Sequence, residues 1–107
     1  MAEGKNPQLA SLEQSLINFL TSKKDIEDKV NGGAKRVRAL TFNIDMHNAK
    51  NPVFTVQIGM CEAAFDCRTG LKSKGNCFGL ERYIRDWFER PAVTNEINTF
   101  ISSQKKD

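Results

Sequence analysis

One histidine and three cysteines are the residues of this chain that could hold a metal ion: His47, Cys61, Cys67 and Cys77. One imidazole and three thiolates would complete the tetrahedral shell of a structural zinc ion. Structural zinc sites usually contain ligand pairs separated by roughly two to four residues. The intervals here contain thirteen, five and nine residues. The spacing therefore argues against zinc, and we expect no metal and no other cofactor.

Nucleophilic and acid–base catalysis are the next chemistries to consider. A Cys–His pair needs His47 to reach a thiol and a third group to orient it, and several strand pairings would bring His47 near Cys61. Asp45 and Asp66 fall on polar positions of neighbouring expected strands and could approach each other. The glycines of residues 75–80 precede a helix, but the Lys and Ser/Thr of a nucleotide loop are missing. A small enzyme or zinc protein using Cys and His is therefore only an alternative prediction, behind a non-enzymatic one.

The positive charge of the chain is concentrated in two clusters. Arg36 and Arg38 are expected to open the first long strand, and Arg68, Lys72 and Lys74 fall near a turn and a short edge strand. Cations on such strands would bind phosphates in a salt-dependent way. No aromatic residue alternates with them, as a stacking surface for single strands requires. Nucleic-acid binding through this basic strand edge is our second function hypothesis.

Tyr83, Trp87 and Arg90 fall on successive turns of an expected helix near the C-terminus. Tyr, Trp and Arg are the residue types that most often anchor protein interfaces. The core is the default place for Trp87, but a chain of this size rarely buries all of its aromatic and aliphatic stripes. The first function hypothesis is therefore a protein–protein interface, with a partner protein or a second copy of the chain.

Helices are expected at both ends of the chain. Asn6-Pro7 is typical of a helix start, and the apolar stripe that follows recurs at intervals of three and four residues. That stripe consists of Leu9, Leu12, Leu16, Ile17 and Leu20, widened by Phe19. The polar run 21–29 extends this helix or forms a second short one, and Gly32-Gly33 ends it. Two more helices are expected from Leu80 to Phe88 and from Pro91 onward.

Between the helices the apolar residues alternate with polar ones, which predicts strands. The alternation runs through residues 40–46, 54–58 and 61–67, and its phase changes at Gly59-Met60, where a tight turn or a bulge is expected. Residues 71–77 are expected to form a short edge strand that bears lysines. The prediction is an α+β fold with an N-terminal helix, an antiparallel sheet of three to four strands and two C-terminal helices packed on one face. We expect residues 1–107 to form a single domain whose two ends, residues 1–6 and 102–107, are frayed.

A pattern between Phe42 and Trp87 is similar to a family of small uncharacterised bacterial domains. The residues that carry it are Phe42-Asn43-Ile44-Asp45-Met46-His47-Asn48, Asn51-Pro52-Val53-Phe54-Thr55-Val56, Gly59, Ala63-Ala64-Phe65-Asp66, Thr69-Gly70 and Ile84-Arg85-Asp86-Trp87. Members of that family read His-Asn-Pro-Pro-His-Phe-His-Val and are found in toxin–antitoxin-like gene pairs. Val53 and Thr55 replace their second and third histidines. The resemblance implies a small regulatory or partner-binding protein and carries over no catalytic residue.

The composition of the chain excludes several further classes of protein. The chain has 107 residues, 39% of them apolar and 27% charged, with a net charge of +3. These values exclude disordered, collagen-like and coiled-coil chains. No stretch approaches the roughly 20 apolar residues of a transmembrane helix, so no membrane partner is expected. The first residues lack the apolar segment of a secretory signal, and three cysteines are an odd count for a disulfide framework. We therefore expect a cytoplasmic protein with reduced thiols.

Overall fold

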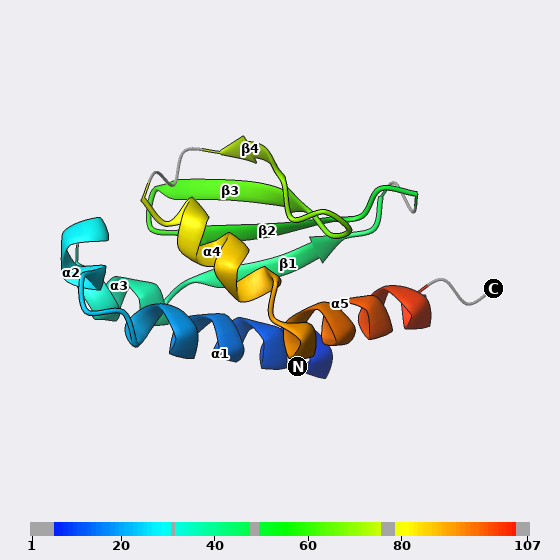
Figure 1. Cartoon of the computed structure of the whole chain (residues 1–107), viewed down its shortest axis with the longest axis horizontal. Helices are drawn as coiled ribbons and strands as arrows, with labels where there is room; N and C mark the ends of the chain where they lie inside the picture. The colour runs from blue at the N-terminus through cyan, green and yellow to red at the C-terminus, as the bar shows by residue number, and fades with distance from the viewer. Residues whose placement is uncertain (1–5, 31, 48–49, 76–78, 105–107) are drawn as a thin grey trace.

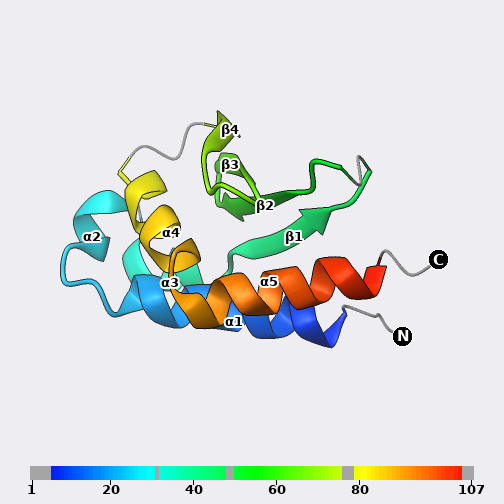
Figure 2. The same cartoon turned by 45° about the vertical axis from the view of Figure 1, so that its right-hand side comes forward.

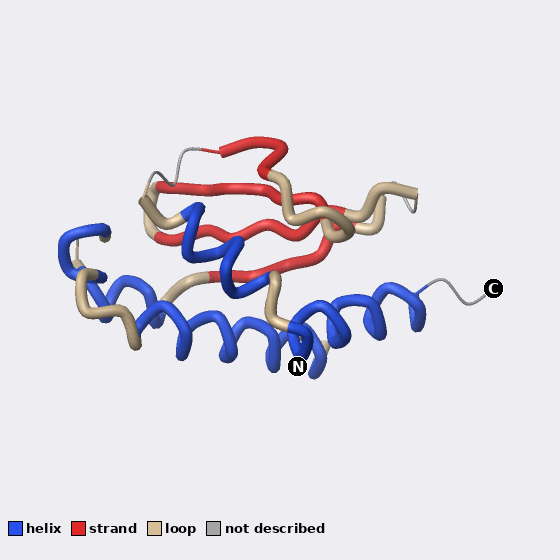
Figure 3. The backbone as a smooth tube through the Cα atoms, viewed as in Figure 1, coloured by secondary structure: helices blue, strands red, loops and turns tan. Residues whose placement is uncertain are grey.

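A four-stranded antiparallel sheet carries the helices on one of its faces (Figure 1). The computed structural model describes residues 6–30, 32–47, 50–75 and 79–104. The strands follow one another in the order of the chain: β1 (Thr41–Asp45), β2 (Val53–Ile58), β3 (Cys61–Asp66) and β4 (Lys72–Gly75). The tube trace shows the strands stacked in the upper half of the view, with α4 in front of them and α1, α3 and α5 below (Figure 3). The predicted α+β class and the predicted meander are confirmed.

The helices that the structure describes are α1 (Pro7–Thr21), α2 (Ile26–Lys29), α3 (Gly33–Arg38), α4 (Glu81–Phe88) and α5 (Pro91–Gln104). Asn6 caps α1, because its side-chain oxygen accepts a hydrogen bond from the Gln8 amide at 2.7 Å. Figure 2 shows α5 running alongside α1, with α4 above them and beside the sheet. None of these helices combines the length and the apolarity needed to cross a membrane.

Two details of the prediction are wrong. Residues 33–38 form α3, so Arg36 and Arg38 lie on a helix and not on the first strand. Gly32 has a φ of 95° and starts this helix, whereas we expected the glycine pair only to end the preceding one. Residues 102–104 form the last turn of α5, and their fraying stays a prediction. The phase change at Gly59 is a tight turn, the first of its two expected forms, with a φ of 60°.

One aromatic cluster joins the sheet to the helices. The rings of Phe42, Phe54 and Phe65 stack across β1, β2 and β3 with centroid distances of 5.5 and 5.2 Å. The Trp87 ring stands edge-on to Phe42 at 5.6 Å and to Phe54 at 6.1 Å. Trp87 is 0% exposed. Contacts of this geometry add about 0.5–1.5 kcal/mol each beyond the area that they bury, so the cluster fixes α4 on the sheet.

Two polar contacts bind α1 to this core. The indole N–H of Trp87 donates a hydrogen bond to the Ser15 hydroxyl at 3.0 Å. The Glu13 carboxylate accepts a hydrogen bond from the backbone N–H of Phe42 at 3.0 Å, on the edge strand β1. An edge strand exposes unpaired backbone groups, and Glu13 satisfies one of them. Strand β1 is therefore covered by α1, whereas the four residues of β4 are exposed at the opposite edge.

We predict that Ser15→Ala destabilises the chain by about 1–3 kcal/mol, because the buried indole N–H of Trp87 loses its acceptor. Ser11→Ala on the same helix is the matched control: Ser11 is exposed, and both substitutions change the helix propensity alike. Urea unfolding followed by tryptophan fluorescence measures both free energies. Equal unfolding free energies for the two variants would show that the Ser15–Trp87 hydrogen bond does not contribute to stability.

Candidate functional site: the α1–α4 surface

The predicted interface residues Tyr83 and Arg90 lie on the surface where α4 crosses α1. Tyr83 is half-buried and Arg90 is exposed, whereas Trp87 between them is completely buried. Trp87 therefore has no exposed atoms for a partner, and the prediction of an interface role is wrong for this residue. Its default placement in the core is confirmed.

Tyr83 and Arg90 belong to a surface cluster of alternating cations and aromatic rings. We call this cluster the cation–aromatic row; it consists of Arg90, Phe19, Lys23, Tyr83 and Lys29. The Phe19 ring lies 4.3 Å from the Lys23 ammonium and 5.1 Å from the Arg90 guanidinium. The Tyr83 ring lies 5.1 Å from Lys23 and 5.9 Å from Lys29. Each cation is therefore held beside a ring face, which attracts positive charge.

A short hydrogen bond fixes one end of the row. The Tyr83 hydroxyl donates to the Asp25 carboxylate at 2.6 Å, and the Lys29 ammonium lies 4.0 Å from the same carboxylate. The hydrogen bond from Tyr83 lowers the pKa of Asp25 below its ordinary value of 3.8, with smaller contributions from Lys29 and Lys23. The same hydrogen bond raises the pKa of Tyr83, because the phenol must stay protonated to donate.

A groove on the outer side of α1 borders the row. We call it the α1 groove; its volume is about 760 Å³. Its uncharged polar lining comes from one helix: Ser11, Gln14, Ser15, Asn18 and Ser22. Phe19, Lys23 and Arg90 complete the lining, so the described residues of the groove include two cations and no carboxylate. The volume lies in the range of ligand sites, about 300–1,000 Å³.

The residues of the second hypothesis are spread over separate parts of the fold. Arg36 and Arg38 lie on α3, beside the end of the sheet that holds the β2–β3 turn. Arg68 lies in the β3–β4 turn at the other end, since Asp66 is opposite Val53 and Cys61 is opposite Ile58. Five strand residues, about 17 Å, separate these two ends. The two basic clusters therefore do not form one patch.

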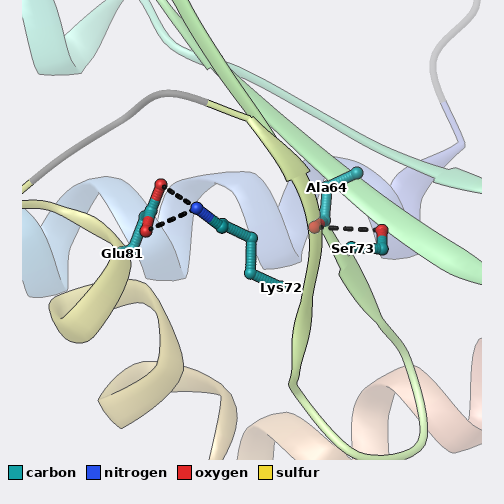
Figure 4. A network of polar contacts seen from close by, with 4 residues as sticks. All are labelled: Ala64, Lys72, Ser73 and Glu81. Atoms are coloured by element: carbon teal, nitrogen blue, oxygen red, sulfur yellow. Dashed lines mark hydrogen bonds and ion pairs between the residues drawn. The ribbon is translucent and has the colours of Figure 1, made fainter.

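Lys72 and Lys74 lie on opposite faces of the sheet although both belong to β4. A bulge lies between Ala64 and Phe65, so that Lys74 is opposite Ala64 on the open face and Lys72 is opposite Phe65 on the helical face. The Lys72 ammonium contacts both carboxylate oxygens of Glu81 at 3.3 Å (Figure 4). Figure 4 also shows the Ser73 hydroxyl donating to the Ala64 carbonyl at 3.2 Å, which ties the bulge to β3.

The open face of the sheet has a hollow of about 560 Å³ that includes Lys74. Asp45 and Glu62 line the same hollow, and Met60 at its rim is 94% exposed. The hollow therefore mixes one cation with two carboxylates. Phosphates favour uniformly basic surfaces, so this face supports nucleic-acid binding weakly.

The sheet separates the residues that could have formed a Cys–His pair. His47 follows the end of β1 that pairs with Val53, whereas Cys61 pairs with Ile58 at the opposite end of β2. The pairing that the sheet adopts is therefore not one of those that could bring His47 near Cys61. Within the described ranges no group of three His, Cys, Asp or Glu side chains could hold a metal ion, and residues 76–78, which include Cys77, lie outside those ranges.

Asp45 and Asp66 act as turn caps and not as a carboxylate pair. They flank Val53 from the two neighbouring strands, which places them two strand spacings apart, about 10 Å. The Asp45 carboxylate accepts the His47 amide at 2.8 Å. The Asp66 carboxylate accepts the amides of Arg68 at 2.7 Å and Thr69 at 3.1 Å. Each carboxylate thus stabilises the turn after its own strand.

Sequence reasoning missed Phe19, Lys23 and Lys29 as site residues. Phe19 was assigned to the apolar stripe of its helix, and the two lysines to a polar run. The available signal was the spacing of Phe19 and Lys23, because residues four apart on a helix are neighbours. The approach of Tyr83 and Arg90 to α1 spans most of the chain and left no local pattern.

Comparisons with protein families, with characterised proteins and with solved structures found no match to this chain. The resemblance between Phe42 and Trp87 therefore stays a prediction.

We predict that Tyr83→Phe raises the pKa of Asp25 toward 3.8, because it removes the hydrogen bond and keeps the ring beside Lys23. Asp25 stabilises the fold above its unfolded-state pKa, and this contribution is lost as the pH falls through its lower folded-state pKa. The destabilisation by Tyr83→Phe should therefore be present at neutral pH and disappear in acid. Carboxyl carbon shifts in an NMR pH titration measure this pKa. Lys29→Met is the control and should raise it less; an unchanged pKa in Tyr83→Phe would contradict the assignment.

We predict that the two described thiols differ in reactivity. Burial, together with the nearby Asp66 charge, raises the pKa of the buried Cys67 thiol to about 12, so it stays protonated at neutral pH. Cys61 is only half-buried, and its thiol donates to the Ile58 carbonyl at 3.2 Å. Iodoacetamide should alkylate Cys61 faster than Cys67 in the folded Cys77→Ser chain, by mass spectrometry of the peptides. Equal rates in the folded chain would mean that Cys67 is not held in the core.

Proposed function

We propose that this chain is a small, non-enzymatic binding protein that acts through a protein–protein interface on its α1–α4 surface. One observation carries the proposal. Tyr83 and Arg90, chosen from the sequence as interface anchors, are joined by Phe19 and Lys23 into one surface cluster. Tyr and Arg are enriched among residues that dominate binding energy.

The low charge of helices α1 and α5 also favours a protein interface at the α1–α4 surface. Helices α1 and α5 together contain two charged residues, Glu13 and Glu96, although 27% of the whole chain is charged. Glu13 is engaged with the edge of β1. Interface centres are depleted in charged side chains, which are costly to desolvate. The outer side of α1 therefore presents hydroxyl and amide groups that a partner can cover at low cost.

The cation–aromatic row also limits the entropy lost on binding. Phe19 and Tyr83 hold the long side chains of Lys23 and Arg90, which would otherwise sample many rotamers. Immobilising such a side chain at an interface costs about 0.5–1.5 kcal/mol. Part of that cost is already met in the free protein, which makes the row a preorganised contact surface.

The partner in this proposal is a protein, either a different chain or a second copy of this one. The proposal also places the chain in the cytoplasm. The odd count of three cysteines, which does not suit a disulfide framework, supports that location.

Site-specific photocrosslinking in the cell of origin tests this function. We predict that p-benzoylphenylalanine in place of Gln14, in the α1 groove, forms a covalent adduct with one defined protein. The matched control replaces Gln57, which is equally exposed but lies on the open face of the sheet. Adduct formation should be lost in the Arg90→Gln background.

An adduct that joins two copies of the chain would identify the partner as a second copy. The absence of an adduct at Gln14, or the same set of adducts at Gln14 and Gln57, would overturn the proposed interface.

A further inference from the structure

Lys23 and Arg90 form no close ion pair. Among the residues that the structure describes, neither cation has an ion pair within 4.0 Å; both lie beside the ring of Phe19. A ring face attracts a cation without neutralising it, and the edge of the guanidinium keeps its N–H donors. Asp25 acts on Lys23 only over a longer distance, since Lys23 is the smallest of the causes that lower the Asp25 pKa. Lys29 and Lys72 differ in this respect, since Lys29 lies 4.0 Å from Asp25 and Lys72 lies 3.3 Å from Glu81.

The floor of the α1 groove supplies further hydrogen-bond donors. The indole N–H of Trp87 can only donate, so the Ser15 hydroxyl is the acceptor of that bond. The hydroxyl proton of Ser15 is then directed elsewhere and can donate to a ligand. One turn further along, the Asn18 side-chain oxygen accepts from Gln14 at 3.0 Å, which orients the Asn18 amide group as a donor.

The groove therefore combines neutral donors with two cations that lack a close ion pair, and none of the described residues that line it is a carboxylate. We propose that the α1 groove binds an acidic segment of the partner protein, with Lys23 and Arg90 contacting its carboxylates. The hydroxyl and amide groups of Ser15 and Asn18 contact the backbone carbonyls of that segment. This inference deepens the proposed function and depends on it for the identity of the partner as a protein.

Two features favour an acidic peptide over a nucleic acid. The faces of Phe19 and Tyr83 have cations beside them and are not bare surfaces on which bases stack. A nucleic acid also needs a basic track for successive phosphates, whereas the adjoining helices α1 and α5 carry no cation. Two neighbouring cations suit a short acidic stretch.

A titration of the full chain with a short glutamate-rich peptide, followed by NMR, tests the inference. The peptide should shift the amide signals of residues 14–23 and of Arg90, and added salt should weaken binding. A glutamine-rich peptide of the same length and a single-stranded oligothymidylate are the comparison ligands. Both should bind more weakly than the glutamate-rich peptide.

Lys23→Gln and Arg90→Gln should each weaken binding of the glutamate-rich peptide about three- to tenfold, since each removes one charge-assisted contact. Lys24→Gln is the matched control: it removes the same charge from the next residue, which is exposed and lies outside the groove lining. Circular dichroism verifies that all three variants are folded.

Three results would overturn the inference: equal affinity for the glutamate and glutamine peptides, unchanged affinity in both groove variants, or tighter binding of oligothymidylate. If one of them occurs while the Gln14 adduct still forms, the interface stands and only its preference for acidic segments is wrong. If the peptide binds as expected and the adduct is missing, the groove recognises acidic segments but the proposed cellular interface is wrong.

Discussion

The burial of Trp87 between the sheet and α1 is the contact on which the rest of the structure depends. Helix α4 has eight residues and is too short to be stable alone in water. Its position comes from Trp87, whose ring contacts Phe42 and Phe54 and whose N–H is bonded to Ser15. Tyr83 lies one turn before Trp87 and Arg90 just under one turn after it. Fixing the tryptophan therefore also fixes both surface residues against α1.

This arrangement concentrates positive charge at one place on the surface, the α1 groove. The chain carries +3 overall, and the hollow on the open face of the sheet mixes both signs. Around the α1 groove the balance differs, because α1 and α5 are nearly uncharged and Phe19 holds two cations. Fields from such a cluster act on association and partner choice more than on stability. The aromatic rings thus have two roles. The buried rings pack the core, and the rings of Phe19 and Tyr83 hold the cations of the row in place.

Local patterns predicted most of the fold. The alternation through Phe54 and Phe65 gave the strands, and the apolar stripe of residues 9–20 gave α1. Helix α3 was missed because six residues are too few to show a helical stripe, and its stability depends on packing against α1 and α2. That omission misplaced Arg36 and Arg38. Residue type alone identified Tyr83 and Arg90, whereas Phe19 and Lys23 became part of the site through contacts between distant segments, which single-sequence periodicity does not contain.

In the proposed interface, acidic segments bind along α1 and not on the open face of the sheet. Paramagnetic relaxation enhancement from a spin-labelled glutamate-rich peptide distinguishes the two faces, because the label broadens only the amide signals close to it. We expect strong broadening at residues 14–23 and at Arg90, with the signals of Thr55 and Gln57 on the open face unaffected. Broadening centred on Thr55 and Gln57, or spread evenly over both faces, would contradict binding along α1.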